Sequence, residues 1–142
     1  NSLLSLGYTF LYNEVLGATK KELDNNIHFL KKISIVTFPT DFKIMKEYAK
    51  LVNTFGKGES ACMAYCKFTE DVVGSSNFRD VCRYCEDNNI THLGTIDFLY
   101  YAVNNGIMTE EEAIKNMDEM IAKGSFLPTV TNFSNYKPTS VV

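Results

Sequence analysis

The sequence predicts an α/β fold of three layers, with a short parallel sheet between two layers of helices. Short β-rich runs alternate along the chain with stretches whose apolar residues recur at helical spacing, an order typical of parallel sheets. The chain has 142 residues, of which 45% are hydrophobic and 22% charged, as in ordinary globular proteins. This length favours a single domain with a sizeable core. We expect that domain to span residues 1–128, with a tail at 129–142 that is irregular or forms an edge strand.

The first half of the chain contains the best strand candidate. The run ISIVTF at 33–38 is short and β-branched, and Pro39 ends it. Thr40 or Asp41 then caps a helix whose apolar residues recur at helical spacing. The other elements predicted here are the end of a helix at 1–7, a strand at 8–11, and helices at 13–24 and 59–68.

The second half predicts two short extended runs, at 72–74 and 91–94, with helices between and after them. A helix at 96–104 should stop at Asn105-Gly106, because glycine readily takes the left-handed conformation that ends helices. Thr109 and Glu112 have the spacing of a capping box, which predicts a helix that runs to Lys123 and ends at Gly124. A further helix is predicted at 78–86.

Charge and hydropathy narrow the classes of function. The formal net charge is -3 and the sequence pI about 5.4, so the chain lacks the strongly basic balance that usually accompanies nucleic-acid binding. Lysines are frequent in the first third and leave room for a local basic patch. No apolar run is long enough to cross a membrane, and no signal-peptide pattern occurs. We therefore expect no membrane partner.

The four cysteines form two close pairs, Cys62 with Cys66 and Cys82 with Cys85. Both pairs fall in predicted helices, where they suit a buried face better than a disulfide framework, and a reduced, cytoplasmic setting is the simpler interpretation. A Cys₄ zinc site is the alternative. Structural zinc sites usually place their cysteine pairs in tight turns, so we expect no zinc.

Three polar residues are candidates for one site. Glu59 lies in the first turn of a predicted helix, and Asn77 and Asp80 follow the predicted strand at 72–74. Taken singly, they suit an acid at a helix start, an Asx cap and a solvated acid. Open α/β sheets, however, gather polar groups beyond the carboxyl ends of their strands. Carboxylates and amides that meet there are ligands that Mg²⁺ or Mn²⁺ prefers.

Two further acids could join this site. Glu14 lies in YNEVL, beside apolar residues, where a surface-facing helical Glu is the simpler account. Asp97, in TIDFL, opens a helix after an extended run and is a spare acid near the same sheet edge. Its simpler account is a negative charge that suits a helix N-terminus.

Taken together, the order of these residues resembles that of the PIN-domain nucleases, which are small α/β proteins. Three stretches carry the resemblance: LYNEVLGA around Glu14, GKGESACMAYC around Glu59, and DVVGSSNFRDV with Asn77 and Asp80. It spans most of residues 3–128 and is specific only between Glu59 and Asp80. The family's opening strand, which ends in a metal-binding Asp, has no counterpart in this sequence. We expect either that it lies upstream of Asn1 or that the domain is a degenerate member.

The resemblance implies a divalent-metal-dependent endoribonuclease. Glu14, Glu59 and Asp80 would hold Mg²⁺ or Mn²⁺, with Asp97 as a spare, and Asn77 would orient a ligand or the scissile phosphate. The metal would activate water and stabilise charge on the phosphate oxygens. Many members are toxins of toxin–antitoxin pairs, so the implied partners are RNA, a small antitoxin-like protein or a second copy of the chain. The alternative is a catalytically degenerate module that binds protein partners.

Overall fold

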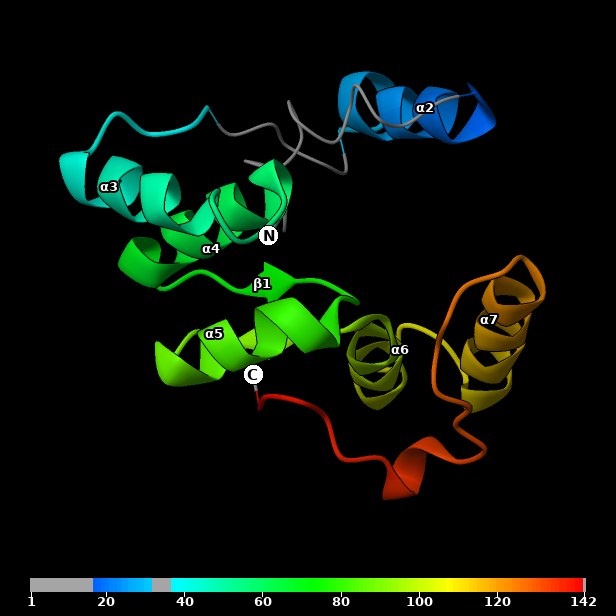
Figure 1. Cartoon of the computed structure of the whole chain (residues 1–142). Coiled ribbons are helices and arrows are strands. Elements are labelled where there is room, and N and C mark those ends of the chain that lie inside the picture. The colour runs from blue at the N-terminus through cyan, green and yellow to red at the C-terminus, as the bar shows by residue number, and fades with distance from the viewer. Residues whose placement is uncertain (1–16, 32–36, 142) are drawn as a thin grey trace.

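The computed structural model describes residues 17–31 and 37–141 of the chain. Helices predominate in this part, together with a parallel sheet of two short strands, β1 (Val73–Gly74) and β2 (His92–Leu93). Val73 lies opposite His92, and Gly74 lies opposite Leu93. Helices combined with a short parallel sheet are compatible with the α/β class that the sequence predicts (Figure 1).

The helical elements are α2 (Gly17–Asp24), α3 (Phe42–Leu51), α4 (Lys57–Thr69), α5 (Arg83–Asp87), α6 (Thr95–Asn104), α7 (Glu110–Ala122), the π-helical turns η1 (Asn25–Phe29) and η2 (Phe78–Cys82), and the 3-10 turn η3 (Phe133–Asn135). The helix predicted at 78–86 thus begins as η2 and continues as α5. The elements predicted at 1–7 and 8–11 lie outside the described residues, as does most of the strand predicted at 33–38. Thr37 and Phe38, its described end, are irregular. Among the described residues, no helix is both long and apolar enough to cross a membrane.

Local capping determines several helix boundaries. Asp41 caps α3, because its Oδ1 accepts hydrogen bonds from the backbone N–H groups of Lys43 and Ile44, at 2.8 and 3.3 Å. The capping box predicted for α7 is present: the Glu112 N–H donates to Thr109 Oγ1 at 3.2 Å, and the Thr109 N–H donates to Glu112 Oε2 at 2.8 Å. The predicted stop after α7 is also confirmed, since Gly124 has a φ of +96°.

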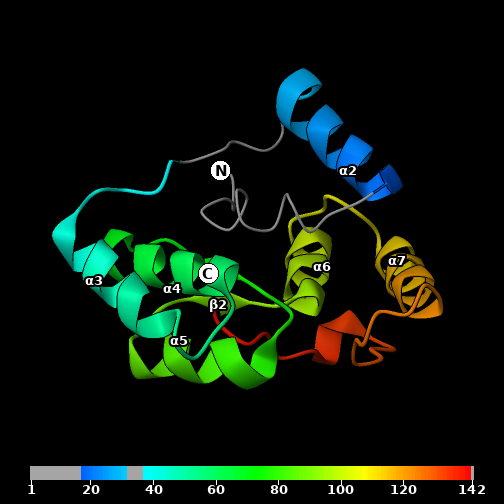
Figure 2. The ribbon, with the colours of Figure 1, turned by 45° about the horizontal axis from the view of Figure 1, so that its top comes forward.

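Two apolar clusters form the core. The first joins α3, α4, β1 and α5, and its buried side chains are Ile44, Leu51, Met63, Ala64, Cys66, Val73, Val81, Cys85 and Ile90. Figures 1 and 2 show α3 and α4 on one side of the strand pair and α5 on the other. The second joins α6, α7 and the C-terminal segment, with Ile96, Leu99, Ala113, Met117 and Phe133 buried.

One buried acid ties three helices of the first cluster together. Glu47 of α3 is 8% exposed. Its Oε1 accepts hydrogen bonds from Lys67 Nζ of α4 at 3.0 Å and from the Tyr84 hydroxyl of α5 at 2.9 Å. Burial raises the pKa of Glu47, but the hydrogen bonds from Lys67, Tyr84 and Lys50 outweigh burial and hold the pKa below its ordinary value. Glu47 therefore stays ionised and cross-links α3, α4 and α5.

Replacing Glu47 with Gln should lower the free energy of unfolding at neutral pH by about 2 kcal/mol, because hydrogen bonds to a charged group are lost. A carboxyl whose folded-state pKa is depressed stabilises the fold above its unfolded pKa, and that stabilisation is lost as pH falls through the folded value. Urea denaturation from neutral pH down to about pH 3 should therefore show a weaker pH dependence for Glu47→Gln than for the unaltered chain. Glu119→Gln, at an exposed acid, is the control, and equal pH dependence in all three proteins would contradict the account.

Candidate functional site

The candidate site lies where β1 and β2 reach their carboxyl ends, beside the first turn of α4. The Asn77 side chain, just after β1, donates from Nδ2 to Glu59 Oε1 of α4 at 2.8 Å. The same nitrogen donates to Asp80 Oδ2 at 3.4 Å. Glu59 and Asn77 are partly buried, and Asp80 is exposed. The structure therefore brings together three of the residues that the sequence singles out.

The start of α4 sets the position of Glu59. Gly56 is the N-cap and has an extended backbone with ψ of 149°. Glu59 folds back over this start, since its Oε2 lies 3.5 Å from the point that a Cβ on residue 56 would occupy. The first N–H groups of a helix lack intrahelical partners and carry partial positive charge, which favours an acid at this place.

Hydroxyl groups fix the segment that carries Asn77. The Asn77 N–H donates to Ser75 Oγ at 3.1 Å, a local turn that presents the Asn77 side chain to Glu59. The Ser76 and Thr95 hydroxyls lie 2.5 Å apart and share a hydrogen bond, which ties the segment after β1 to the first residue of α6. Sequence reasoning missed this pair. The only signal for it is that each hydroxyl comes two residues after a strand.

The donor set of the cluster is two carboxylates and one amide. In the part of the chain that the structure describes, no three His, Cys, Asp or Glu side chains gather closely enough to hold a metal ion. Mg²⁺ commonly uses only one or two carboxylates and keeps several waters, so the oxygens of Glu59 and Asp80 suit it. Half a turn of the Asn77 amide would bring its oxygen to the place of Nδ2, because the two ends of an amide have nearly the same shape.

Two of the predicted acids are not seen in this cluster. Glu14 lies outside the described residues. Asp97 is fully buried, and both of its oxygens accept hydrogen bonds from neighbouring protein groups: Oδ2 from the Gly94 N–H at 2.7 Å, and Oδ1 from the Tyr136 hydroxyl at 2.8 Å and the Thr139 N–H at 2.9 Å. Burial raises the pKa of Asp97, but these hydrogen bonds outweigh burial and hold the pKa below its ordinary value.

Two of the cysteines contribute to the core. None of the four forms a disulfide, and Cys66 and Cys85 are buried in the cluster around α4 and α5. Burial raises the pKa of each of these two thiols to about 12. They therefore stay protonated at neutral pH and pack as small apolar side chains.

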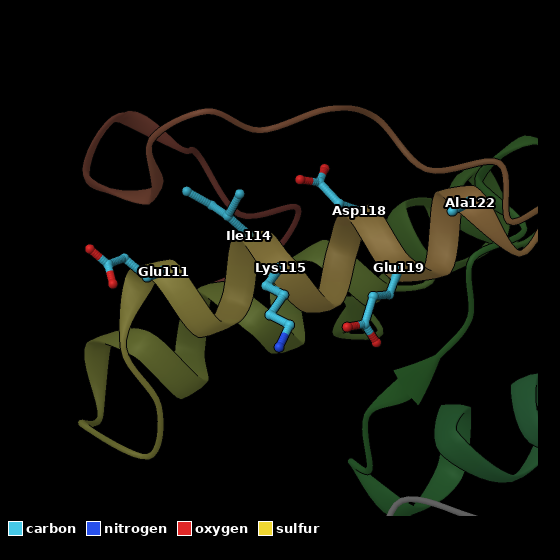
Figure 3. A pocket seen from close by; sticks show the side chains of 6 residues that line it. All are labelled: Glu111, Ile114, Lys115, Asp118, Glu119 and Ala122. Carbon is cyan, nitrogen blue, oxygen red and sulfur yellow. The ribbon is translucent and has the colours of Figure 1, made fainter.

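A second surface feature, a shallow hollow, runs along α7 and contains none of the predicted site residues. Figure 3 shows the side chains that line it along one face of that helix: Glu111, Ile114, Lys115, Asp118, Glu119 and Ala122. Their spacing of three and four residues places them on one helix face. The hollow combines small apolar patches with three acids and one lysine.

Comparison of the chain with protein-family models, with curated proteins and with solved structures yields no match. The PIN-like family thus stays a prediction from the residues.

Replacing Asn77 with Asp should destabilise the fold at neutral pH, because a third carboxylate would then face Glu59 and Asp80. Two like charges about 4 Å apart in water repel by about 1 kcal/mol, and we expect a loss of that order in the free energy of unfolding. Urea denaturation at neutral pH measures this loss. The exposed Asn135→Asp is the control, and an equal loss there would argue against a special environment at Asn77.

Proposed function

We propose that this chain is a PIN-like α/β domain of three layers that binds Mg²⁺ or Mn²⁺ and cleaves RNA by hydrolysis. The observation that carries the proposal is the meeting of Glu59 and Asp80 on the amide of Asn77, 18 and 3 residues away in sequence. These groups gather beyond the carboxyl ends of two parallel strands, the place where open α/β sheets bind their ligands.

Each residue of the cluster has a distinct part in this proposal. Glu59 and Asp80 hold the ion through their carboxylates, and Asn77 turns its amide oxygen toward a ligand or the scissile phosphate. A bound divalent cation supplies an activated water and stabilises charge on the phosphate oxygens. Glu14 is the proposed third acid. Asp97 is left out, because both of its oxygens already accept hydrogen bonds from the protein.

When no cation is bound, the Asn77 amide has a second role. Its two N–H groups face two carboxylates and reduce their mutual repulsion. A cation that enters would take over this charge balance and free the amide to turn. The cluster can thus exist in two arrangements that differ in the orientation of one amide.

The same hydrogen bonds favour a second candidate function. Because the Asn77 amide already satisfies oxygens of both Glu59 and Asp80, the cluster is stable without metal, as a degenerate module would require. Such a module would bind a small antitoxin-like protein or a second copy of the chain. Such a module would keep the α/β fold but would not cleave RNA.

Calorimetric titration with Mn²⁺ separates the two functions. The proposed nuclease should bind Mn²⁺ at one saturable site, and Glu59→Gln should weaken binding about tenfold or more, since loss even of groups that only support a metal ligand costs about 10–100-fold. Single-stranded RNA incubated with Mn²⁺ and analysed on a gel should be cleaved by the unaltered chain and spared by the variant.

Glu119→Gln, in the exposed acidic face of α7, is the matched control and should bind and cleave as the unaltered chain does. Binding and cleavage that survive Glu59→Gln would contradict the proposed site. Absence of Mn²⁺ binding in the unaltered chain would contradict the nuclease and support the interaction module.

A further inference from the structure

The C-terminal segment is attached to the fold through Asp97, a residue of α6. Asp97 has no exposed surface, and its Oδ1 accepts both the Tyr136 hydroxyl and the Thr139 N–H, 39 and 42 residues away in sequence. Its other oxygen accepts the N–H of Gly94, the residue between β2 and α6. One carboxylate therefore joins the C-terminal segment to the end of β2.

A second connection reaches β2 from the same segment. The His92 N–H donates to Ser140 Oγ at 3.2 Å, and the Tyr101 hydroxyl of α6 donates to the Ser140 carbonyl at 2.8 Å. Residues 136–140 are thus bound to β2 through His92 and to α6 through Asp97 and Tyr101. Figure 2 shows the red C-terminal segment reaching β2, and Figure 1 shows this segment passing below α6.

Both connections continue into the segment that carries Asn77. The first connection runs from Asp97 to Gly94 by a hydrogen bond and from Gly94 to its neighbour Thr95 along the chain. The Thr95 hydroxyl hydrogen-bonds that of Ser76 at 2.5 Å. The second connection runs through His92, whose imidazole Nε2 lies 2.8 Å from the Ser75 carbonyl oxygen. Ser75 and Ser76 are the two residues before Asn77, so both connections end directly beside the candidate site.

We propose that Asp97 is a positioning residue, which locks the C-terminal segment 136–140 onto β2 and thereby holds Asn77 in reach of Glu59 and Asp80. This inference rests on the proposed function in treating the Asn77 cluster as a site, but the positioning itself is independent of any metal. It gives Asp97 a task different from that of a spare metal ligand. It also makes the C-terminal segment part of the machinery that shapes the site.

The geometry explains why a carboxylate stands at this position. Oδ1 receives two donors from the C-terminal segment, and Oδ2 receives a third from Gly94, so every contact requires an acceptor. An amide offers one acceptor oxygen, and its NH₂ end would oppose at least one of these donors. Asp97→Asn should therefore release either the C-terminal segment or the Gly94 turn.

The test is NMR on the full chain with four variants. In Asp97→Asn, hydrogen exchange should accelerate at the Thr139 amide or at the Gly94 amide, whichever the asparagine releases, by about tenfold or more, the factor that one lost hydrogen bond to a charged group represents. The side-chain NH₂ resonances of Asn77 should shift at the same time. Tyr136→Phe removes one donor and should give a smaller change of both kinds, which keeps the test decisive if Asp97→Asn does not fold.

Two further variants test whether the C-terminal segment acts on Asn77 rather than the reverse. Thr95→Val breaks the link to Ser76 and should shift the Asn77 resonances while the Thr139 amide stays protected. Lys137→Ala changes an exposed side chain in the same segment and should alter neither signal. Faster exchange at Thr139 or Gly94 in Asp97→Asn with unchanged Asn77 resonances would overturn the inference. Failure of the unaltered chain to bind Mn²⁺ would contradict the proposed nuclease, and the inference would still be decided by the Asn77 resonances.

Discussion

The parallel pairing of β1 with β2 is the constraint on which the described structure depends. Only two residues of each strand pair, Val73 with His92 and Gly74 with Leu93, yet this register decides which side chains meet. Because the strands are parallel, the chain leaves both strands at the same edge of the sheet. The Asn77 segment and the start of α6 therefore lie side by side, and the C-terminal segment finds its place next to β2.

At this edge, hydrogen-bond donors balance the charge of carboxylates in two settings, one buried and one closer to solvent. Asp97 is buried, and three hydrogen-bond donors compensate the cost of removing its charge from water. Glu59 and Asp80 lie closer to solvent, and one amide lies between them. The buried acid is committed to the fold, whereas the outer pair keeps carboxylate oxygens within reach of a ligand. This contrast is the physical basis for proposing a structural role for Asp97 and a cation site at the Glu59 cluster.

Local features of the sequence predict local structure well. The caps at Asp41 and Thr109 follow from side chains that bond the backbone two or three residues away, so a short window contains all the information. The meeting of Glu59 with Asn77 follows from a general property of parallel strands. The contacts of Glu47 with Tyr84 and of Asp97 with Thr139 span 37 and 42 residues. They depend on how whole helices pack, which no single window of sequence contains.

The most direct test of the central claim is to locate where Mn²⁺ binds, by its paramagnetic effect on the NMR spectrum of the full chain. Paramagnetic broadening falls steeply with distance, so it identifies the nuclei nearest the ion. The account predicts that substoichiometric Mn²⁺ broadens the Asn77 side-chain amide first, together with the backbone amides of Glu59 and Asp80. Broadening centred on the acids of α7, or spread evenly over the surface, would contradict a cation site at the edge of the parallel strands.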